Sequence, residues 1–218
     1  MTPGPHLVYF ADPMCSWCWG FSPVVGAIGE RFGDALPIRL VLGGLRPWTT
    51  KPMDDKARAS TRSHWEHVHE ASGQPFDFAF FDRPSFVYDT EPACRALVVM
   101  RRRDMRDARA GFHRIQAAFY AENRDVTDPA VLTAIAGELG FDQSEFRAQL
   151  ESDSARDETR ADFATAQDVG VTGFPTFLAG DAGGHYALVT QGYQPADIIL
   201  PALGRWLAQI PPTGREPG

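Results

Sequence analysis

Apolar residues recur with different periods along the chain, and the first part alternates between strand and helix. Short apolar, β-branched runs at residues 7–11 and 37–42 predict two strands. Between them, helical spacing extends to about Phe32, where Gly33 is expected to end the helix. A strand, a crossover helix and a second strand within the first 45 residues predict a βαβ unit.

The middle of the chain keeps a helical period. Helices are predicted over residues 54–72, in two successive segments from residue 91, and over residues 128–139 and 142–150. Residues 74–88 differ, because they are dense in phenylalanine and interrupted by prolines. This stretch predicts a loop that packs its aromatic side chains under a helical cap.

The last part returns to a strand period after one more helix, over residues 154–169. Residues 176–179 and 186–190 predict two strands of a hairpin, joined by a glycine-rich turn. A final helix is predicted over residues 195–209, and Pro201 within it predicts a kink or a break. Residues 211–218 are expected to form a disordered tail.

Composition narrows the functional classes. The chain has 218 residues and a net charge of −7, and its longest basic run is Arg101–Arg103. Phosphate binding needs clustered positive charge, so nucleic acid is not an expected partner. No segment approaches the ~18–20 apolar residues of a membrane span, and the N-terminus lacks the charged start of a secretory signal. Because the chain has only three cysteines, we expect a cytoplasmic protein. Because no apolar segment is long enough, we expect no membrane partner.

Two of these cysteines form the motif Cys15-Ser16-Trp17-Cys18, where the first strand passes into the first helix. A sulfur at a helix N-terminus meets unpaired N–H groups and the positive end of the helix dipole, which favour the thiolate. The second sulfur is close enough to attack a mixed disulfide formed by the first. A redox dithiol is therefore the favoured interpretation, and a buried pair or half of a zinc site is the alternative.

A second informative stretch runs from Val171 to Thr176 and contains Phe174-Pro175 immediately before a predicted strand. A proline in this position is suited to a cis peptide bond.

These segments resemble the DsbA-like thioredoxin-fold oxidoreductases, in particular their cytosolic FrnE-like branch, and the related kappa-class glutathione transferases and 2-hydroxychromene-2-carboxylate isomerases. The similarity lies in residues 12–18, 88–95, 128–132 and 171–176 and extends over most of residues 7–209. It implies an α/β, thioredoxin-like fold with an inserted all-helical domain. The expected division is a discontinuous thioredoxin-like domain (1–45 and 154–210) and a helical insertion (46–153).

The resemblance also implies a chemistry. Cys15 is expected to attack and Cys18 to resolve the mixed disulfide, with Ser16, Trp17, Phe174 and Pro175 contacting the substrate. The implied function is thiol–disulfide exchange on disulfide- or thiol-containing proteins or small molecules. No metal and no cofactor beyond the redox disulfide are expected, with glutathione a candidate co-substrate. The transferase and isomerase relatives usually carry serine in place of Cys15. Separately, no histidine lies between Cys15 and Cys18, and this absence argues against a strong oxidant.

Other interpretations stay open at this stage. A glutathione-dependent transferase or isomerase of small aromatic compounds is the main alternative, and a chaperone role for the insertion is a third. Cys94 lies on an apolar helical face and is expected to be a core residue. His64, His67 and His69 are expected on a solvated helical face. Asp12 is expected to cap the following turn or to assist proton transfer near Cys18.

Overall fold

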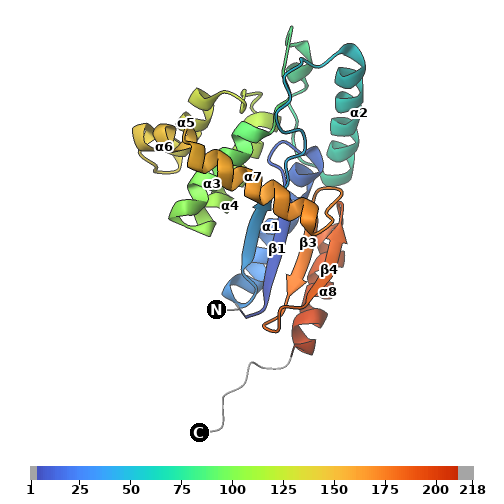
Figure 1. The fold of residues 1–218 in the computed structure, drawn as a ribbon. Coiled ribbons are helices and arrows are strands. Elements are labelled where there is room, and N and C mark those ends of the chain that lie inside the picture. Colours follow the sequence, from blue (N-terminus) through green and yellow to red (C-terminus); the bar gives the residue numbers. More distant parts are fainter. Residues whose placement is uncertain (1–3, 211–218) are drawn as a thin grey trace.

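The computed structural model describes residues 4–210 and is built around one four-stranded sheet (Figure 1). The strands are β1 (His6–Ala11), β2 (Ile38–Leu42), β3 (Thr176–Gly180) and β4 (Tyr186–Gln191), in the order β2-β1-β3-β4. β1 pairs in parallel with β2 and antiparallel with β3, which pairs antiparallel with β4. The predicted βαβ unit and the C-terminal hairpin are both confirmed.

Strand β1 lies at the centre, and all six of its residues are buried. One face of the sheet packs against α1 (Ser16–Phe32) and α8 (Ala196–Gln209), and the other packs against α7 (Asp153–Asp168). Alternate residues of β1 therefore enter different layers. Leu7, Tyr9 and Ala11 belong to the large core under α1, whereas Val8 and Phe10 pack with Ala166 of α7.

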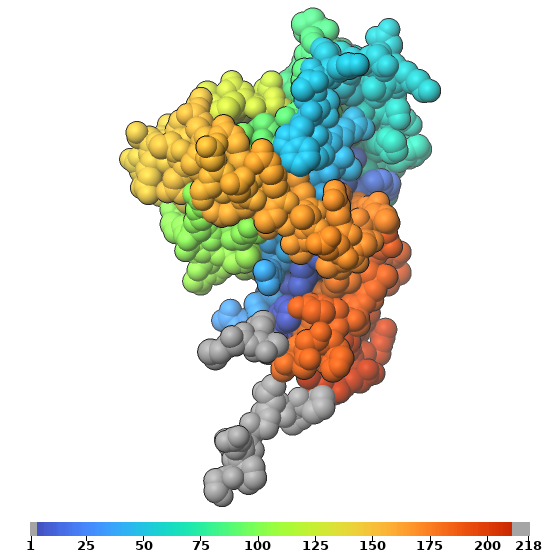
Figure 2. All heavy atoms as spheres, viewed as in Figure 1, coloured from blue at the N-terminus to red at the C-terminus, as the bar shows by residue number. Residues whose placement is uncertain are grey.

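Between β2 and α7 the chain forms a block of helices. They are α2 (Asp55–Ser72), α3 (Glu91–Arg103), α4 (Met105–Tyr120), α5 (Pro129–Glu138) and α6 (Gln143–Leu150). Figure 1 shows α2 standing apart from α3–α6, which cluster on the other side of the molecule. In Figure 2, the side chains of α7 (orange) extend from this cluster across the visible face toward the hairpin. The predicted fold class, a thioredoxin-like fold with a helical insertion, is confirmed; the domain boundaries stay a prediction.

The phenylalanine-rich stretch packs under α2, as its composition indicated. Trp65 of α2 is 1% exposed. Its ring lies 4.9–6.3 Å from those of Phe76, Phe78, Phe80, Phe81, Phe119 and Tyr120. The stretch is not loop throughout, however. It contains the short 3-10 helix η2 (Phe78–Asp82), which begins where the Asp77 carboxylate accepts a hydrogen bond from the Ala79 N–H.

Of the kink or break predicted at Pro201, the break does not occur, because α8 continues through this residue to Gln209; the kink stays a prediction. Pro201 removes one backbone donor from the helix. Ile199 and Leu203, on either side of it, are 2% and 1% exposed and anchor the helix to the sheet. The packing of Ile199 and Leu203 therefore outweighs the tendency of Pro201 to interrupt the helix. The predicted tail, residues 211–218, lies outside the described residues, and no helix within residues 4–210 combines the length and apolarity needed to cross a membrane.

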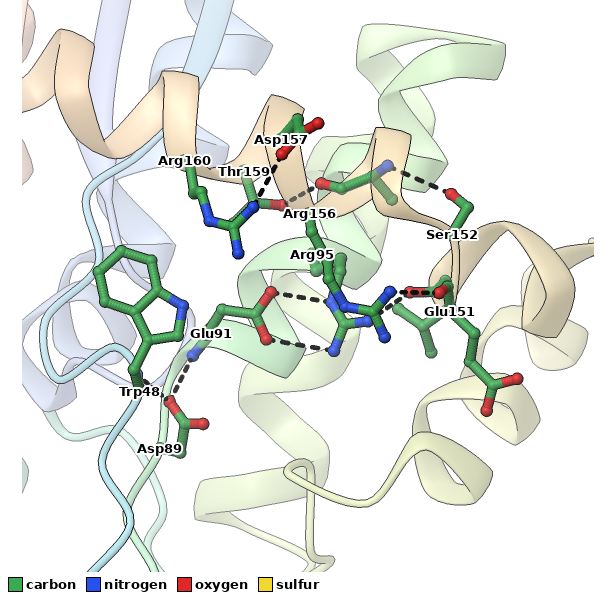
Figure 3. A network of polar contacts seen from close by, with 12 residues as sticks. Trp48, Asp89, Glu91, Arg95, Glu151, Ser152, Arg156, Asp157, Thr159 and Arg160 are labelled. Carbon is green, nitrogen blue, oxygen red and sulfur yellow. Dashed lines mark hydrogen bonds and ion pairs between the residues drawn. The ribbon is translucent and has the colours of Figure 1, made fainter.

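A buried ion pair lies within α3, and its arginine also bonds to the end of α6 (Figure 3). Arg95 Nε lies 2.9 Å from Glu91 Oε1, and Arg95 Nη2 donates to Glu91 Oε2 at 3.1 Å. Arg95 Nη1 also donates to the carbonyl of Leu150 at the end of α6. On the adjoining loop, the Asp89 carboxylate accepts from the N–H groups of Trp48 and Glu91. These contacts fix the start of α3 relative to the segment that follows β2.

Candidate active site

The two motif cysteines lie at the start of α1, directly after the central strand. Cys15 is the N-cap residue of α1, and its N–H donates to the Asp12 carbonyl at 3.0 Å. Cys18 lies within the first turn of the helix. Both are free thiols; Cys15 is 6% exposed and Cys18 is 0% exposed. Cys15 is therefore the sulfur nearer the surface, and Cys18 lies beneath it.

The loop before β3 faces Cys15. The Cys15 thiol donates to the Phe174 carbonyl at 3.7 Å, and the Phe174–Pro175 bond is cis, as the sequence predicted. The Phe174 ring rests directly on the backbone after β2, since a Cβ added to Gly43 would lie 2.0 Å from its atoms. Glycine at this position thus allows the proline loop to approach the dithiol.

Asp12 fixes the turn between β1 and α1. Its Oδ1 accepts from the Met14 N–H at 2.8 Å and its Oδ2 from the Leu45 N–H at 2.6 Å. Burial raises the pKa of this carboxyl, and the two N–H donors oppose that rise. The capping interpretation of Asp12 is confirmed, and the carboxylate also ties the dithiol turn to the segment after β2.

Cys94 lies on the inner side of the same turn. It is 0% exposed, as expected of a core residue, and its thiol donates to Asp12 Oδ2 at 3.6 Å. Burial raises the pKa of Cys94 well above its ordinary value, and the neighbouring Asp12 carboxylate adds to this effect. Cys94 is thus a neutral thiol at neutral pH.

Cys18 is held as a neutral thiol too. Burial raises its pKa well above the ordinary value, and the adjacent Cys15 adds to the rise. Next to Cys18 lies Tyr9 of β1, whose pKa is also raised by burial first and by Cys18 second. The inner sulfur of the motif is therefore surrounded by neutral groups.

A cleft of about 160 Å³ opens between Cys15 and α2. It is lined by Met14, Cys15, Ser16, Trp17, Leu45, Arg46, Thr61, His64, Trp65 and Tyr88. The Tyr88 hydroxyl donates to the Met14 carbonyl at 2.7 Å, and the Arg46 guanidinium lies 4.8 Å from the centre of the Tyr88 ring. Two donors in the wall, Thr61 Oγ1 and Trp65 Nε1, are buried without a hydrogen-bond partner within residues 4–210.

A second cleft, of about 240 Å³, lies on the other side of Trp17 and is lined by Trp17, Phe174, Gly192 and Tyr193. The rings of Trp17 and Tyr193 are 5.7 Å apart. Of the predicted substrate-contacting residues, Ser16, Trp17 and Phe174 thus line clefts beside Cys15. Pro175 is buried behind Phe174. The structure thus places Ser16, Trp17 and Phe174 beside Cys15, with Pro175 next to Phe174 in the chain.

Several cleft residues could not be identified from the sequence as belonging to the site. Arg46, Thr61 and Trp65 come from the segment after β2 and from α2, and no motif marks them. His64, His67 and His69 are exposed on α2 as predicted, but His64 also borders the Cys15 cleft. Within residues 4–210, His, Cys, Asp and Glu side chains form no group of three suited to a metal ion.

Comparison with known proteins gives a consistent set of relatives. The model of the DSBA-like thioredoxin domain matches residues 6–203. A candidate protein disulfide isomerase from Nitrosomonas europaea is 38% identical, with a TM-score of 0.88 over 95% of this chain and 99% of that one. The cytosolic disulfide reductase DsbM from Pseudomonas aeruginosa is 28% identical, with a TM-score of 0.75 over 92% and 98% of the two chains, and its structure is also known with GSH.

Among curated proteins, the chain is similar to the ClpXP adapter protein SpxH from Halalkalibacterium halodurans. The two are 24% identical over 182 residues, which is 80% of this chain. The chain spans 58% of that adapter's length. The proteins similar to this chain thus include some that are named as disulfide isomerases or reductases and some that are named as adapters.

Proposed function

The chain belongs to the family of DSBA-like thioredoxin domains, and from this we propose that it is a thiol–disulfide oxidoreductase that acts through Cys15 and Cys18. The observation that carries the proposal is the position of Cys15. Cys15 is the N-cap residue of α1, and its sulfur faces the carbonyl of Phe174, next to the cis Pro175, with a second thiol one turn deeper. This arrangement supports a mixed disulfide at Cys15 that Cys18 resolves.

The proposed exchange has two steps. The Cys15 thiolate attacks one sulfur of a substrate disulfide, which forms a mixed disulfide and releases the other substrate sulfur as a thiolate. Cys18 then loses its proton and attacks Cys15, which forms the Cys15–Cys18 disulfide and releases the reduced substrate. Two electrons pass from the dithiol to the substrate, and the released thiolates take up the protons. The sequence is reversible, and its direction depends on the reduction potential of the pair.

We propose the reducing direction. The chain is similar to a cytosolic disulfide reductase, DsbM. Moreover, Ser16 and Trp17 lie between the cysteines and provide no cation to stabilise the Cys15 thiolate, as a strong oxidant would require. A cytoplasmic location is part of the same proposal, because reducing activity needs a compartment rich in thiols.

Glutathione is the proposed source of electrons, and the 160 Å³ cleft between Cys15 and α2 is its proposed site. The cleft borders Cys15 and offers the Arg46 cation for a carboxylate, and the similar protein DsbM has a known structure with GSH. Two glutathione molecules would reduce the Cys15–Cys18 disulfide and leave as glutathione disulfide.

The experiment is trapping with three cysteine variants. Cys18→Ala should accumulate mixed disulfides with glutathione and protein substrates, and Cys15→Ser should abolish both trapping and insulin reduction. Cys94→Ala is the matched control, because Cys94 is equally buried but faces Asp12, and it should keep wild-type exchange. If Cys15→Ser retains full insulin-reduction activity, the proposal is wrong. If Cys18→Ala keeps full transfer of glutathione to a small aromatic acceptor, the transferase alternative replaces it.

A further inference from the structure

The cavities around α1 differ in whether they reach the dithiol. One of them, the α1–α4 cavity, has a volume of about 330 Å³ and is lined by residues of these two helices and by Tyr9, but by neither motif cysteine. Cys15 instead lines the smaller cleft, of about 160 Å³, that lies between it and α2. A side chain that assists exchange at Cys15 therefore belongs on the walls of this smaller cleft.

One face of α2 forms the opposite wall of the Cys15 cleft. His64 and Trp65 lie three and four residues after Thr61, so these residues share one side of the helix. Trp65 is 1% exposed and packs against the aromatic rings of the stretch that follows α2. This packing fixes the neighbouring His64 at the wall of the cleft, where its imidazole is exposed.

The three histidines of α2 differ in what their rings contact. His69 Nδ1 lies 2.8 Å from the carbonyl oxygen of Gln74, and His67 does not line the cleft. His64 lines it, and its ring nitrogens form no hydrogen bond or ion pair within residues 4–210. His64 therefore presents free nitrogens to a molecule in the cleft, and His67 provides a matched control on the same helix.

Few groups in the cleft can exchange a proton near neutral pH. The titratable groups that share it with His64 are Cys15 of α1, Arg46 after β2 and Tyr88 before α3. Arg46 keeps its charge throughout, and burial raises the pKa of Tyr88, so its hydroxyl stays protonated. No Asp or Glu lines the cleft. Histidine, in contrast, ordinarily changes its charge between pH 5 and 8, so His64 is the side chain suited to proton transfer with a bound substrate.

The chemistry of glutathione requires such a group. The thiolate is the attacking species, and an ordinary thiol with a pKa of about 8.5 is only about 3% thiolate at pH 7. A neighbouring imidazolium that brought this pKa to about 7 would raise the thiolate fraction about 16-fold. Because a more acidic thiol is a weaker nucleophile, with a Brønsted slope of about 0.4–0.5, the net gain in rate would be about three- to fourfold at pH 7.

We propose that His64 takes the thiol proton of glutathione in the Cys15 cleft and holds the resulting thiolate as an ion pair. In the oxidised protein this thiolate attacks Cys15, which forms a glutathione–Cys15 disulfide, breaks the Cys15–Cys18 bond and releases Cys18. A second glutathione thiolate attacks the glutathione sulfur of the mixed disulfide and leaves as glutathione disulfide. Two glutathione thiols are thereby oxidised, and their two protons and two electrons convert the protein disulfide into two thiols. The inference rests on the exchange and the glutathione site proposed above.

The test is the reduction of the oxidised full chain by glutathione between pH 6 and pH 9.5, followed by tryptophan fluorescence. His64→Gln should react about three- to sixfold more slowly than the wild type at pH 6–7. Above about pH 8 it should react no more slowly, because glutathione then ionises without help and keeps its full nucleophilicity. His67→Gln should follow the wild type at every pH.

The shape of the pH profile separates this role from a structural one. A rate lowered by the same factor at every pH would mean that His64 only supports the cleft, and it would overturn the inference. A His64→Gln profile identical to that of the wild type would overturn it as well. In both cases the exchange at Cys15 would stand, because the Cys18→Ala trapping experiment tests it separately. If glutathione does not reduce the oxidised wild-type protein at all, the proposed glutathione site and the role of His64 are both wrong.

Discussion

Buried polar side chains occur in two regions of this protein, and the regions differ in how their polar atoms are paired. Near Arg95, the guanidinium group bonds to the Glu91 carboxylate and the Leu150 carbonyl, and on α7 the Thr159 hydroxyl donates to the Ala155 carbonyl (Figure 3). Arg95 Nε makes only the ion-pair contact with Glu91. Around α1, the residues that line the Cys15 cleft and the α1–α4 cavity include buried polar atoms without partners, such as Thr61 Oγ1 and Gln116 Nε2.

The difference separates two uses of buried polarity. A paired group positions helices, and its pairing offsets part of its desolvation cost. An unpaired group costs stability in the free protein and is retained where a molecule that binds can pair with it. The Arg95 contacts therefore tie α3 to the end of α6, whereas the unpaired groups around α1 carry a stability cost.

The largest expected effect comes from breaking the paired region. Arg95→Ala leaves the Glu91 carboxylate buried without its cation, so the free energy of unfolding should fall by about 3–5 kcal/mol in urea titrations. Arg160→Ala, which removes an exposed ion pair with Asp157, should change it by less than about 1 kcal/mol. Equal effects of the two variants would show that the Arg95 pair is not the contact that fixes α3.

A second effect concerns the neutral thiols around the dithiol turn. An unfolded cysteine ionises near 9.0, whereas burial keeps folded Cys18 and Cys94 protonated to higher pH. Above pH 9 the unfolded state binds fewer protons than the folded state. The stability of the reduced protein should therefore fall by about 1.4 kcal/mol per pH unit for each such group.

The two cysteine variants isolate these contributions. Cys18→Ala and Cys94→Ala should each reduce the alkaline loss of stability by about 1.4 kcal/mol per pH unit. The measurement is urea unfolding of reduced protein between pH 9 and the folded-state pKa. An alkaline decline identical to that of the wild type in both variants would contradict the assignment of these thiols as neutral.

The smallest effect gives the most direct contrast between the two regions, because one substitution should act with opposite signs. Thr61→Val removes an unpaired hydroxyl beside the Cys15 cleft and should stabilise the free protein by up to about 1 kcal/mol. Thr159→Val removes a hydroxyl that donates to the Ala155 carbonyl at 2.7 Å and should destabilise it by about 1 kcal/mol. Changes of the same sign would remove the distinction between paired and unpaired regions.

The features of the site that depend on adjacent residues could be predicted from the sequence. The Cys15–Cys18 motif, the start of α1 and the cis bond before Pro175 all follow from adjacent residues, whose local preferences agree with the fold. The helices follow for the same reason, since Asp54 and Asp142 precede helical runs and accept hydrogen bonds from N–H groups of the first turn.

The remaining features depend on contacts between distant segments. Asp12 is readily recognised as a cap, but its bond to Leu45 depends on how the chain returns after β2. Gln116 gave a partial signal, because it lies four residues after Phe112 on the buried face of α4. Its partnership with Tyr9 in one cavity is a tertiary feature, as is the packing that keeps α8 continuous through Pro201.

Tyr9 has a consequence that extends beyond either site. It lines the α1–α4 cavity, and the neighbouring Cys18 helps to raise the pKa of its hydroxyl. The cavity and the dithiol therefore share one residue. Thermodynamic linkage is reciprocal: a ligand that binds the reduced protein more tightly than the oxidised protein must favour reduction by the same factor. The ratio of a ligand's dissociation constants for the two redox forms would then equal the factor by which saturating ligand shifts the Cys15–Cys18 equilibrium. The concentration of such a ligand would then influence the redox state of Cys15 and Cys18 through Tyr9.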